Sequence, residues 1–154
     1  DTLLIIPGLS KLQVIHIFGD KDYEPLKNKY KDLPIRIKSF PFLAQMQYAY
    51  SAADLVISRA GAITIAELIY FKLPAIILPY PFAQAHQLSN AQVLEDAGSA
   101  VVIKDNELTP SKLGECLSSF INSPERLKKM QINYDNIAVN NAHSLLAEAA
   151  ISLI

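Results

Sequence analysis

The sequence predicts an α/β fold with a Rossmann-like, doubly wound parallel sheet, and three observations favour it. Five short runs rich in β-branched residues occur along the 154-residue chain, and each is followed by a stretch with helical periodicity. Parallel neighbouring strands need a crossover, and right-handed crossovers place helices on both faces of a sheet. The central runs also lack polar alternation, as expected for strands that are covered on both sides.

In chain order, the predicted strands are LQVIHIF (12–18), IRIKSF (35–40), LVIS (55–58), AIILPY (75–80) and AVVIK (100–104). The helices that follow them are expected at about 23–31, 43–53, 62–72, 86–97 and 109–122. Thr109 and Pro110 have the order of an N-cap and first helical residue, and Gly98 lies just past a helix end. Ser123 and Pro124 start another helix in the same way, and the pattern stays helical to the end of the chain, where LLAEAAISLI is expected to form a helix that packs on an apolar surface.

Composition restricts the class of protein. Hydrophobic residues make up 51% of the chain and charged residues 19%, which predicts a soluble globular domain; residues 1–154 are expected to form one domain. The net charge of -1 and the scattered lysines argue against nucleic acid as a partner. Cys116 is the single cysteine, which excludes an internal disulfide and fits a reducing, cytoplasmic setting. The opening DTLLIIPGL resembles the end of a helix already under way, so we expect an incomplete chain.

Candidate ligand-binding residues follow the predicted strands, where open parallel sheets bind their ligands. Small residues in the loop Arg59–Ala62 would let a phosphate approach backbone amides at a helix start. His86, Gln87 and Asn90 offer neutral polar groups that suit hydroxyls. Two further loops would face the same cleft, and they contain Gly19 and the pair Phe42 and Leu43.

Glu67 is a lone carboxylate in the second turn of the helix that starts near Ala62. A carboxylate there could accept hydrogen bonds from both hydroxyls of a ribose, which together with a phosphate and a sugar site indicates a nucleotide-sugar. The alternatives are that Glu67 only favours the helix dipole and that His86, Gln87 and Asn90 form a solvated helix start. Arg59 could pair with a surface acid, and Gly61 could serve only the turn.

Other polar residues have structural interpretations. His16 lies in a buried-looking strand and is expected to be a core histidine, while Tyr50 is expected to contribute to packing. Ser58 lacks the histidine and aspartate partners of a hydrolase triad. No pair of acids suggests a magnesium site, so we expect neither a metal nor a cofactor.

Three stretches resemble the C-terminal, donor-binding domain of the MurG family of bacterial glycosyltransferases: ADLVISRAGAITIAEL, LPAIILPYPFAQAHQLSNAQVLEDAGSAVVI and NELTPSKL. The similarity runs from about Val14 to about residue 122 and is strongest over 52–104. The resemblance implies the GT-B fold, of which this would be the C-terminal half. It also implies inverting transfer of N-acetylglucosamine from UDP-N-acetylglucosamine to lipid I, which forms lipid II for peptidoglycan. Such an enzyme would visit the cytoplasmic face of the bacterial membrane as a peripheral protein.

The resemblance also assigns roles to individual residues. Glu67 would hold the ribose hydroxyls, Ala62 would offer its backbone amide to the sugar, and Gln87 and Asn90 would bind sugar hydroxyls. Leu43 would contact uracil through its backbone. The remaining members of the predicted donor site are Phe42 over the base, His86 near the donor, and Arg59, Gly61 and Gly19 in the surrounding loops.

Two departures from the family pattern affect these expectations. Phe18 precedes Gly19 where relatives carry a small hydroxyl residue that contacts the diphosphate. A Gly-Gly-Ser loop, its strand and the acceptor domain with the general base are expected to be missing, so no catalytic residue is predicted here and a strand edge would stay unpaired. The alternatives are a nucleotide-sugar-binding subunit of a two-chain transferase or another GT-B enzyme, such as a glycolipid synthase or a UDP-N-acetylglucosamine 2-epimerase.

Overall fold

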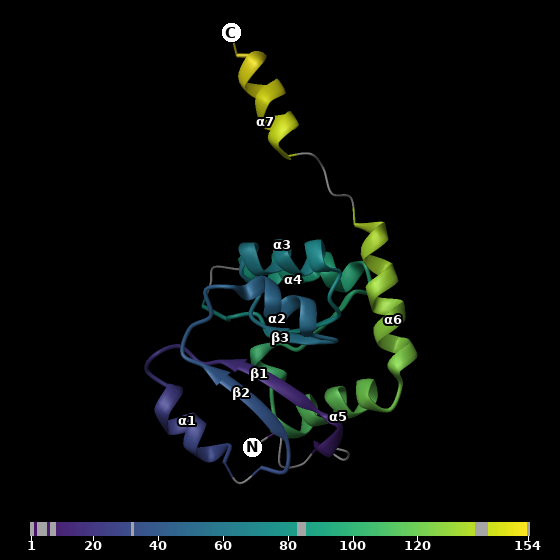
Figure 1. The fold of residues 1–154 in the computed structure, drawn as a ribbon. Coiled ribbons are helices and arrows are strands. Elements are labelled where there is room, and N and C mark those ends of the chain that lie inside the picture. The colour runs from purple at the N-terminus through teal and green to yellow at the C-terminus, as the bar shows by residue number, and fades with distance from the viewer. Residues whose placement is uncertain are drawn as a thin grey trace.

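The computed structural model describes residues 2, 6, 9–31, 33–82, 86–137 and 142–153. Strands and helices alternate along the chain as predicted (Figure 1). The elements are β1 (Gln13–Ile17), α1 (Tyr23–Lys29), β2 (Arg36–Phe40), α2 (Met46–Ala52), β3 (Val56–Ser58), α3 (Ala62–Phe71), β4 (Ala75–Ile77), α4 (His86–Asp96), β5 (Ala100–Val102), α5 (Pro110–Ile121), α6 (Pro124–Asn133) and α7 (Ala142–Ile151). Most of the opening stretch DTLLIIPGL, and the expectation attached to it, lie outside the described residues.

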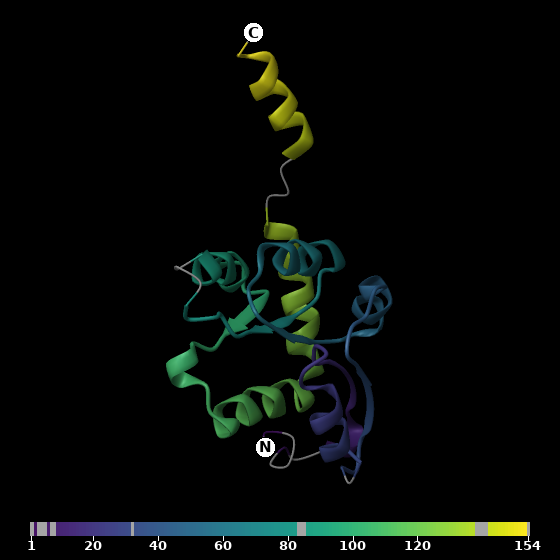
Figure 2. The same ribbon diagram turned by 90° about the vertical axis from the view of Figure 1, so that its left-hand side faces the viewer.

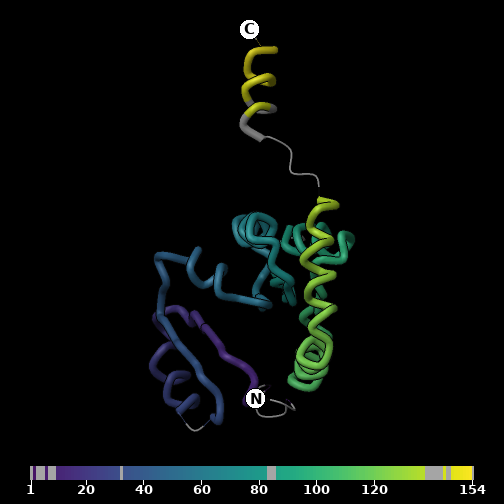
Figure 3. The backbone as a smooth tube through the Cα atoms, turned by 45° about the vertical axis from the view of Figure 1, so that its right-hand side comes forward, coloured from purple at the N-terminus to yellow at the C-terminus, as the bar shows by residue number. Residues whose placement is uncertain are grey.

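All described strand pairs are parallel, but they form two sheets. β1 pairs with β2, while β3, β4 and β5 pair in that order. Figure 3 shows the β1–β2 unit with α1 beside the larger unit built on β3 to β5. Among the described residues β1 and β3 each pair on one side only, and Ile15 and Ile57 in the middle of these strands are 46% and 44% exposed. Because the strands form two separate sheets, four strand edges are unpaired among the described residues, those of β1, β2, β3 and β5, where the sequence predicted that a missing strand would leave one.

Helices cover both faces of the larger sheet, which confirms the doubly wound class. Figure 2 shows α3 and α4 on one side of the strands and α5 on the other. β4 is fully buried, and its successive side chains enter different cores: Ala75 and Ile77 pack with residues of α3 and α4, whereas Ile76 packs with residues of α5 and α6. This alternation is the consequence of the two-residue repeat of a strand.

The predicted helix ends are largely as observed. Thr109 Oγ1 accepts a hydrogen bond from the Lys112 amide at 3.1 Å, and Pro110 is the first residue of α5. Gly98 has a φ of +71°, a backbone conformation that favours glycine, and its amide bonds Glu95 O at 2.8 Å. Ser123 precedes Pro124 as expected, although its side chain makes no capping bond.

The C-terminal helix α7 lies away from the rest of the structure in Figures 1 and 2. The sequence predicted that this helix packs on an apolar surface. Instead, Ile151 is 70% exposed and Leu153, just beyond the helix, is 88% exposed. Among the described residues, no helix has the length and apolar character needed to cross a membrane.

Candidate functional site

The predicted site residues lie beyond the carboxyl ends of four strands. Gly19 follows β1, Phe42 and Leu43 follow β2, and the Arg59–Ala62 loop follows β3. His86, Gln87 and Asn90 lie in the first turns of α4, which follows β4. The part of that loop formed by residues 83–85 lies outside the described residues.

Gln87 and Asn90 bind the backbone of the same residue, Ala60. Gln87 Oε1 accepts hydrogen bonds from the Ala60 amide at 3.2 Å and from the Tyr80 amide at 2.9 Å. Asn90 Nδ2 donates to the Ala60 carbonyl at 3.0 Å. Because Ala60 is completely buried, these side chains satisfy backbone groups that water cannot reach. They thereby join the loops after β3 and β4.

The side-chain amides of Gln87 and Asn90 each have a second polar atom. Among the described residues, no hydrogen bond is made by Gln87 Nε2 or Asn90 Oδ1. Both residues are half-buried, which argues against the simple solvated helix start that was the alternative. His86, by contrast, is exposed. The structure therefore offers one amide donor and one amide acceptor at this edge of the sheet.

Arg59, which follows β3, contacts the segments that follow β4 and β5. Its Nη1 donates to the carbonyls of Leu78 at 3.0 Å and Pro79 at 3.4 Å. Its guanidinium carbon lies 5.5 Å from the ring centroid of Tyr80, and Nη1 lies 3.8 Å from Asp105 Oδ1 beyond β5. The pairing with a surface acid that the sequence left open is thus present, and most of its bonds fix the loop after β4.

Glu67 is held by a tyrosine. Glu67 is the sixth residue of α3 and so lies past the first turn. The helix dipole acts within the first turn, so it does not account for the position of this carboxylate. Tyr50 of α2 donates its hydroxyl hydrogen to Glu67 Oε2 at 2.9 Å. Burial, the hydrogen bond and the negative charge of Glu67 raise the pKa of Tyr50 to about 12, so the phenol stays protonated at neutral pH.

The sequence predicted a packing role for Tyr50 but did not predict the hydrogen bond that its hydroxyl makes. The ring does pack, with its centroid 5.4 Å from that of Phe71, but the hydroxyl has a second role as a donor to Glu67. A buried phenol needs a hydrogen-bond partner, and this need is the signal that could have pointed to a polar neighbour. It could not have identified Glu67, 17 residues away in the sequence.

The start of α3 presents backbone donors. The amide of Ile65 bonds Gly61 O at 2.9 Å, whereas those of Ala62, Ile63 and Thr64 have no hydrogen bond within the described part of the chain. No acid lies in the first turn, so an anion would meet the positive end of the helix unopposed. Gly61 has a φ of -63°, and a Cβ there would lie 3.6 Å from Thr64 Oγ1, so neither the turn nor packing requires glycine.

The loops after β1 and β2 form a neighbouring pair. Gly19, with a φ of +79°, donates its amide hydrogen to Pro41 O at 3.0 Å. Leu43 is half-buried, and Phe42 is 73% exposed at the surface. α2, which carries Tyr50, begins three residues after Leu43, so this helix connects the second loop to Glu67.

Phe18, the residue that departs from the family pattern, belongs to an aromatic cluster. Its ring centroid lies 3.9 Å from that of His16 and 5.6 Å from that of Tyr30. His16 Nδ1 and Tyr30 Oη are 2.7 Å apart, so this histidine has a polar partner, and partial burial lowers its pKa. The expected buried strand is not observed, however, because His16 is only half-buried and β1 contains no buried residue. The aromatic side chain thus replaces a polar loop contact with packing between β1 and α1.

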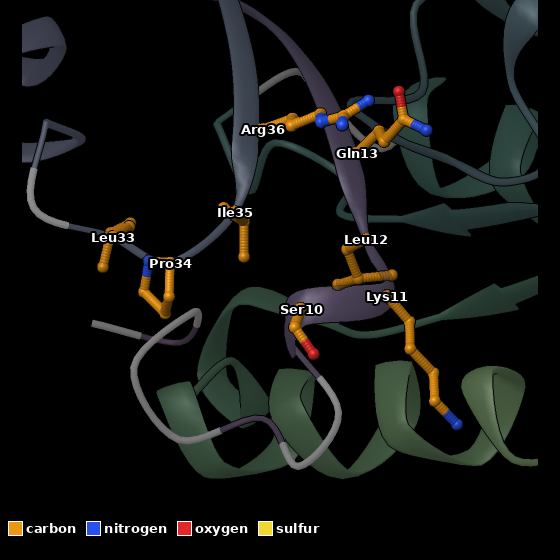
Figure 4. Close-up of a pocket in the computed structure, with 8 residues that line it drawn as sticks. All are labelled: Ser10, Lys11, Leu12, Gln13, Leu33, Pro34, Ile35 and Arg36. Atoms are coloured by element: carbon orange, nitrogen blue, oxygen red, sulfur yellow. The ribbon is translucent and has the colours of Figure 1, made fainter.

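A cavity of about 470 Å³ lies at the opposite end of the smaller sheet (Figure 4). Its lining residues come from the amino ends of β1 and β2: Ser10, Lys11, Leu12, Gln13, Leu33, Pro34, Ile35 and Arg36. None of the predicted site residues lines it. Among the described residues, no group of three or more histidines, cysteines and acids is placed to hold a metal ion.

Known proteins are similar to this chain in sequence and in fold. The chain matches the family model of the glycosyltransferase family 28 C-terminal domain over residues 6–147. A relative from Halothermothrix orenii is 44% identical over 128 residues, which are 79% of this chain and 34% of that protein. It is named UDP-N-acetylglucosamine--N-acetylmuramyl-(pentapeptide) pyrophosphoryl-undecaprenol N-acetylglucosamine transferase, as is a Myxococcus xanthus relative that is 36% identical over 93% of this chain and 38% of its own length.

Solved structures agree with these relatives. The crystal structure of Acinetobacter baumannii MurG matches with a TM-score of 0.81 and 32% identity, over 90% of this chain and 40% of that one. The glycosyltransferase VinC, solved in complex with dTDP, has a TM-score of 0.60 at 17% identity, over 86% of this chain and 41% of that one, and shares the fold. The chain spans 34% to 38% of the length of the two relatives above. Since the family match extends over residues 6–147, this chain belongs to glycosyltransferase family 28 and corresponds to its C-terminal domain.

Proposed function

We propose that this chain is the donor-binding part of an inverting glycosyltransferase that moves N-acetylglucosamine from UDP-N-acetylglucosamine to lipid I. The product would be lipid II, a precursor of peptidoglycan. The observation that carries the proposal is the carboxylate of Glu67, fixed by Tyr50 in the helix whose uncapped start follows the Arg59–Ala62 loop. The names of the relatives support the identity of donor and acceptor.

The nucleotide would lie across the segments that follow β2 and β3, which belong to the two different sheets. The Glu67 carboxylate accepts hydrogen bonds from the ribose hydroxyls, since an ionised carboxylate has about four acceptor sites and Tyr50 uses one. The backbone of Leu43 binds uracil, and the exposed ring of Phe42 lies over the base. The diphosphate lies between Gly19 and the free amides at the start of α3, beginning with Ala62.

The sugar would lie against α4. Gln87 Nε2 donates to one sugar hydroxyl and Asn90 Oδ1 accepts from another, while their opposite atoms hold Ala60. His86, at the exposed start of α4, lies close to the same sugar. Gly61 lets the ligand approach the backbone, and Arg59 keeps the loop after β4 in position. We assign this site no cofactor.

In the reaction, a hydroxyl of the acceptor sugar attacks the anomeric carbon of the donor from the face opposite the diphosphate. The bond from that carbon to the phosphate oxygen breaks, and UDP leaves with the bonding electrons. The helix amides stabilise the charge that develops on the diphosphate. A general base outside this chain takes the hydroxyl proton. Because the acceptor is lipid-linked, the complete enzyme would work at the cytoplasmic face of the membrane as a peripheral protein.

Calorimetric titration of the chain with UDP-N-acetylglucosamine tests the proposal, with UDP-glucose and ADP-glucose as comparison ligands. We expect tighter binding of UDP-N-acetylglucosamine than of either comparison ligand, and a loss of binding in Glu67→Ala. The matched control is Glu95→Ala, which removes an exposed glutamate of α4 and should bind normally. Equal binding of all three ligands, or normal binding by folded Glu67→Ala, would overturn the assignment.

A further inference from the structure

Tyr50 is buried, with only 7% of its surface exposed, in the core between α2, α3 and β4. Its ring contacts Phe71, while its hydroxyl leaves the core and reaches the half-buried Glu67 carboxylate at 2.9 Å. The phenol is therefore anchored on the apolar side and bonded on the polar side. Such a residue can hold a flexible neighbour in one place.

Glu67 needs to be held if it binds a ligand. A glutamate side chain is among those that lose the most rotamer freedom when they are fixed. No salt bridge involves Glu67 among the described residues, so no cation neutralises or orients its carboxylate there. The Tyr50 hydrogen bond occupies one acceptor site of Oε2. It leaves Oε1 and the remaining site of Oε2 for two adjacent hydroxyls.

We infer that Tyr50 is a positioning residue for ribose recognition: its hydroxyl fixes the Glu67 carboxylate before the nucleotide arrives, with the free oxygen directed at the ribose. The inference rests on the proposed function, because it assumes that the ligand is a ribonucleotide. It adds a residue of α2, outside the strand-end loops, to the determinants of nucleotide affinity. The raised pKa of Tyr50 agrees with it, since the donor stays protonated at neutral and moderately alkaline pH.

The test compares two ligands that differ only in the groups Glu67 would bind: UDP and 2′,3′-dideoxy-UDP. Tyr50→Phe keeps the ring and removes the hydroxyl. Tyr48→Phe is the matched control, because Tyr48 lies on the same helix and is 66% exposed. Affinities are measured calorimetrically on chains whose folding has been checked by circular dichroism and thermal melting.

We expect the unsubstituted chain to bind UDP more tightly than 2′,3′-dideoxy-UDP. Tyr50→Phe should weaken UDP binding about 3- to 10-fold, the effect of one hydrogen bond, and change dideoxy-UDP binding by less than about 2-fold. Tyr48→Phe should change neither. An equal loss for both ligands would reduce Tyr50 to a structural role, and no loss for either would also overturn the inference. Failure of the unsubstituted chain to discriminate between the ligands would instead reject the ribose site itself.

If Tyr50→Phe does not fold, alkaline titration of tyrosine absorbance tests whether the Tyr50–Glu67 contact exists in solution. In Glu67→Gln the negative charge beside Tyr50 is gone, so one tyrosine should ionise at a lower pH than in the unsubstituted chain. Superimposable titrations of the two proteins would show that the Tyr50–Glu67 contact is not made in solution, and the inference would fall.

Discussion

Gln87 and Asn90 turn opposite ends of their side-chain amides toward Ala60, so only Asn90 should lose stability when each is replaced by the acid of the same shape. Gln87 uses its oxygen to accept from two backbone amides, and Gln87→Glu keeps an oxygen there. Asn90 uses its nitrogen to donate to the Ala60 carbonyl at 3.0 Å. Asn90→Asp would place a second acceptor against that carbonyl.

The expected sizes follow from burial. Ala60 is 0% exposed, so a carbonyl that loses its donor there is left unsatisfied, at a cost of about 1–3 kcal/mol. For a domain of this size, Asn90→Asp should lower Tm by about 3–9 °C at neutral pH. Gln87→Glu should stay within about 0.5 kcal/mol of the unsubstituted chain, because a carboxylate accepts both amide hydrogens at least as well as an amide oxygen.

Thermal and urea denaturation of both variants provide the assay. Gln47→Glu is the control, since Gln47 is an exposed residue of α2 that is distant in sequence from both amides. The loss in Asn90→Asp should shrink at acidic pH, because a protonated carboxyl can donate to the carbonyl again. Equal stability losses in Asn90→Asp and Gln87→Glu, or a larger loss in Gln87→Glu, would refute the amide orientations and with them the donor and acceptor assigned to the sugar site.

Three further predictions concern single positions. Burial lowers the pKa of His16 below its ordinary value of 6.5, so the unfolded chain binds a proton more readily than the folded chain, and the free energy of unfolding should fall as pH drops below about 6.5. In His16→Gln, the slope of urea-derived stability against pH over this range should be smaller. An unchanged slope would contradict the burial argument. Gly98→Ala should cost about 1–2 kcal/mol in the same measurement, because its φ is +71°. Gly61→Ala should cost less than about 0.5 kcal/mol yet weaken UDP binding, and a stability loss equal to that of Gly98→Ala would show that the turn itself requires glycine.

The order of strands and helices could be predicted because it depends on local patterns. The first three residues of the run AIILPY form the buried strand β4, which is shorter than predicted, and the pair Thr109 and Pro110 begins a helix, as the sequence indicated. The division of the strands into two sheets could not be read in this way. Strand pairing is a long-range property, and neither QVIHI of β1 nor VIS of β3 contains a local pattern that predicts which strand is its hydrogen-bonded neighbour.

The site was predictable as a set of loops but not as a set of contacts. Gly19, Leu43, Ala62 and Asn90 do lie beyond strand ends, as the topology required. Apart from the bond between Tyr80 and Gln87, which are 7 positions apart, the hydrogen bonds that fix Glu67, Gln87 and Asn90 join residues 17 to 30 positions apart, such as Tyr50 with Glu67 and Asn90 with Ala60. No periodicity or motif spacing carries that information, since these contacts arise only when α2, α3 and α4 pack together.

These contacts also explain why the sequence left Glu67, Gln87 and Asn90 balanced between structural and ligand-binding roles. In the structure each has one polar atom bonded within the protein at 2.9–3.2 Å, while another acceptor or donor has no bond among the described residues. The structural role fixes the rotamer, and a fixed rotamer loses less freedom when a ligand binds. Removing the internal partner should therefore weaken ligand binding even where the ligand-facing residue is intact. The Tyr50→Phe experiment separates these effects, because it leaves Glu67 in place and removes only the bond that orients it.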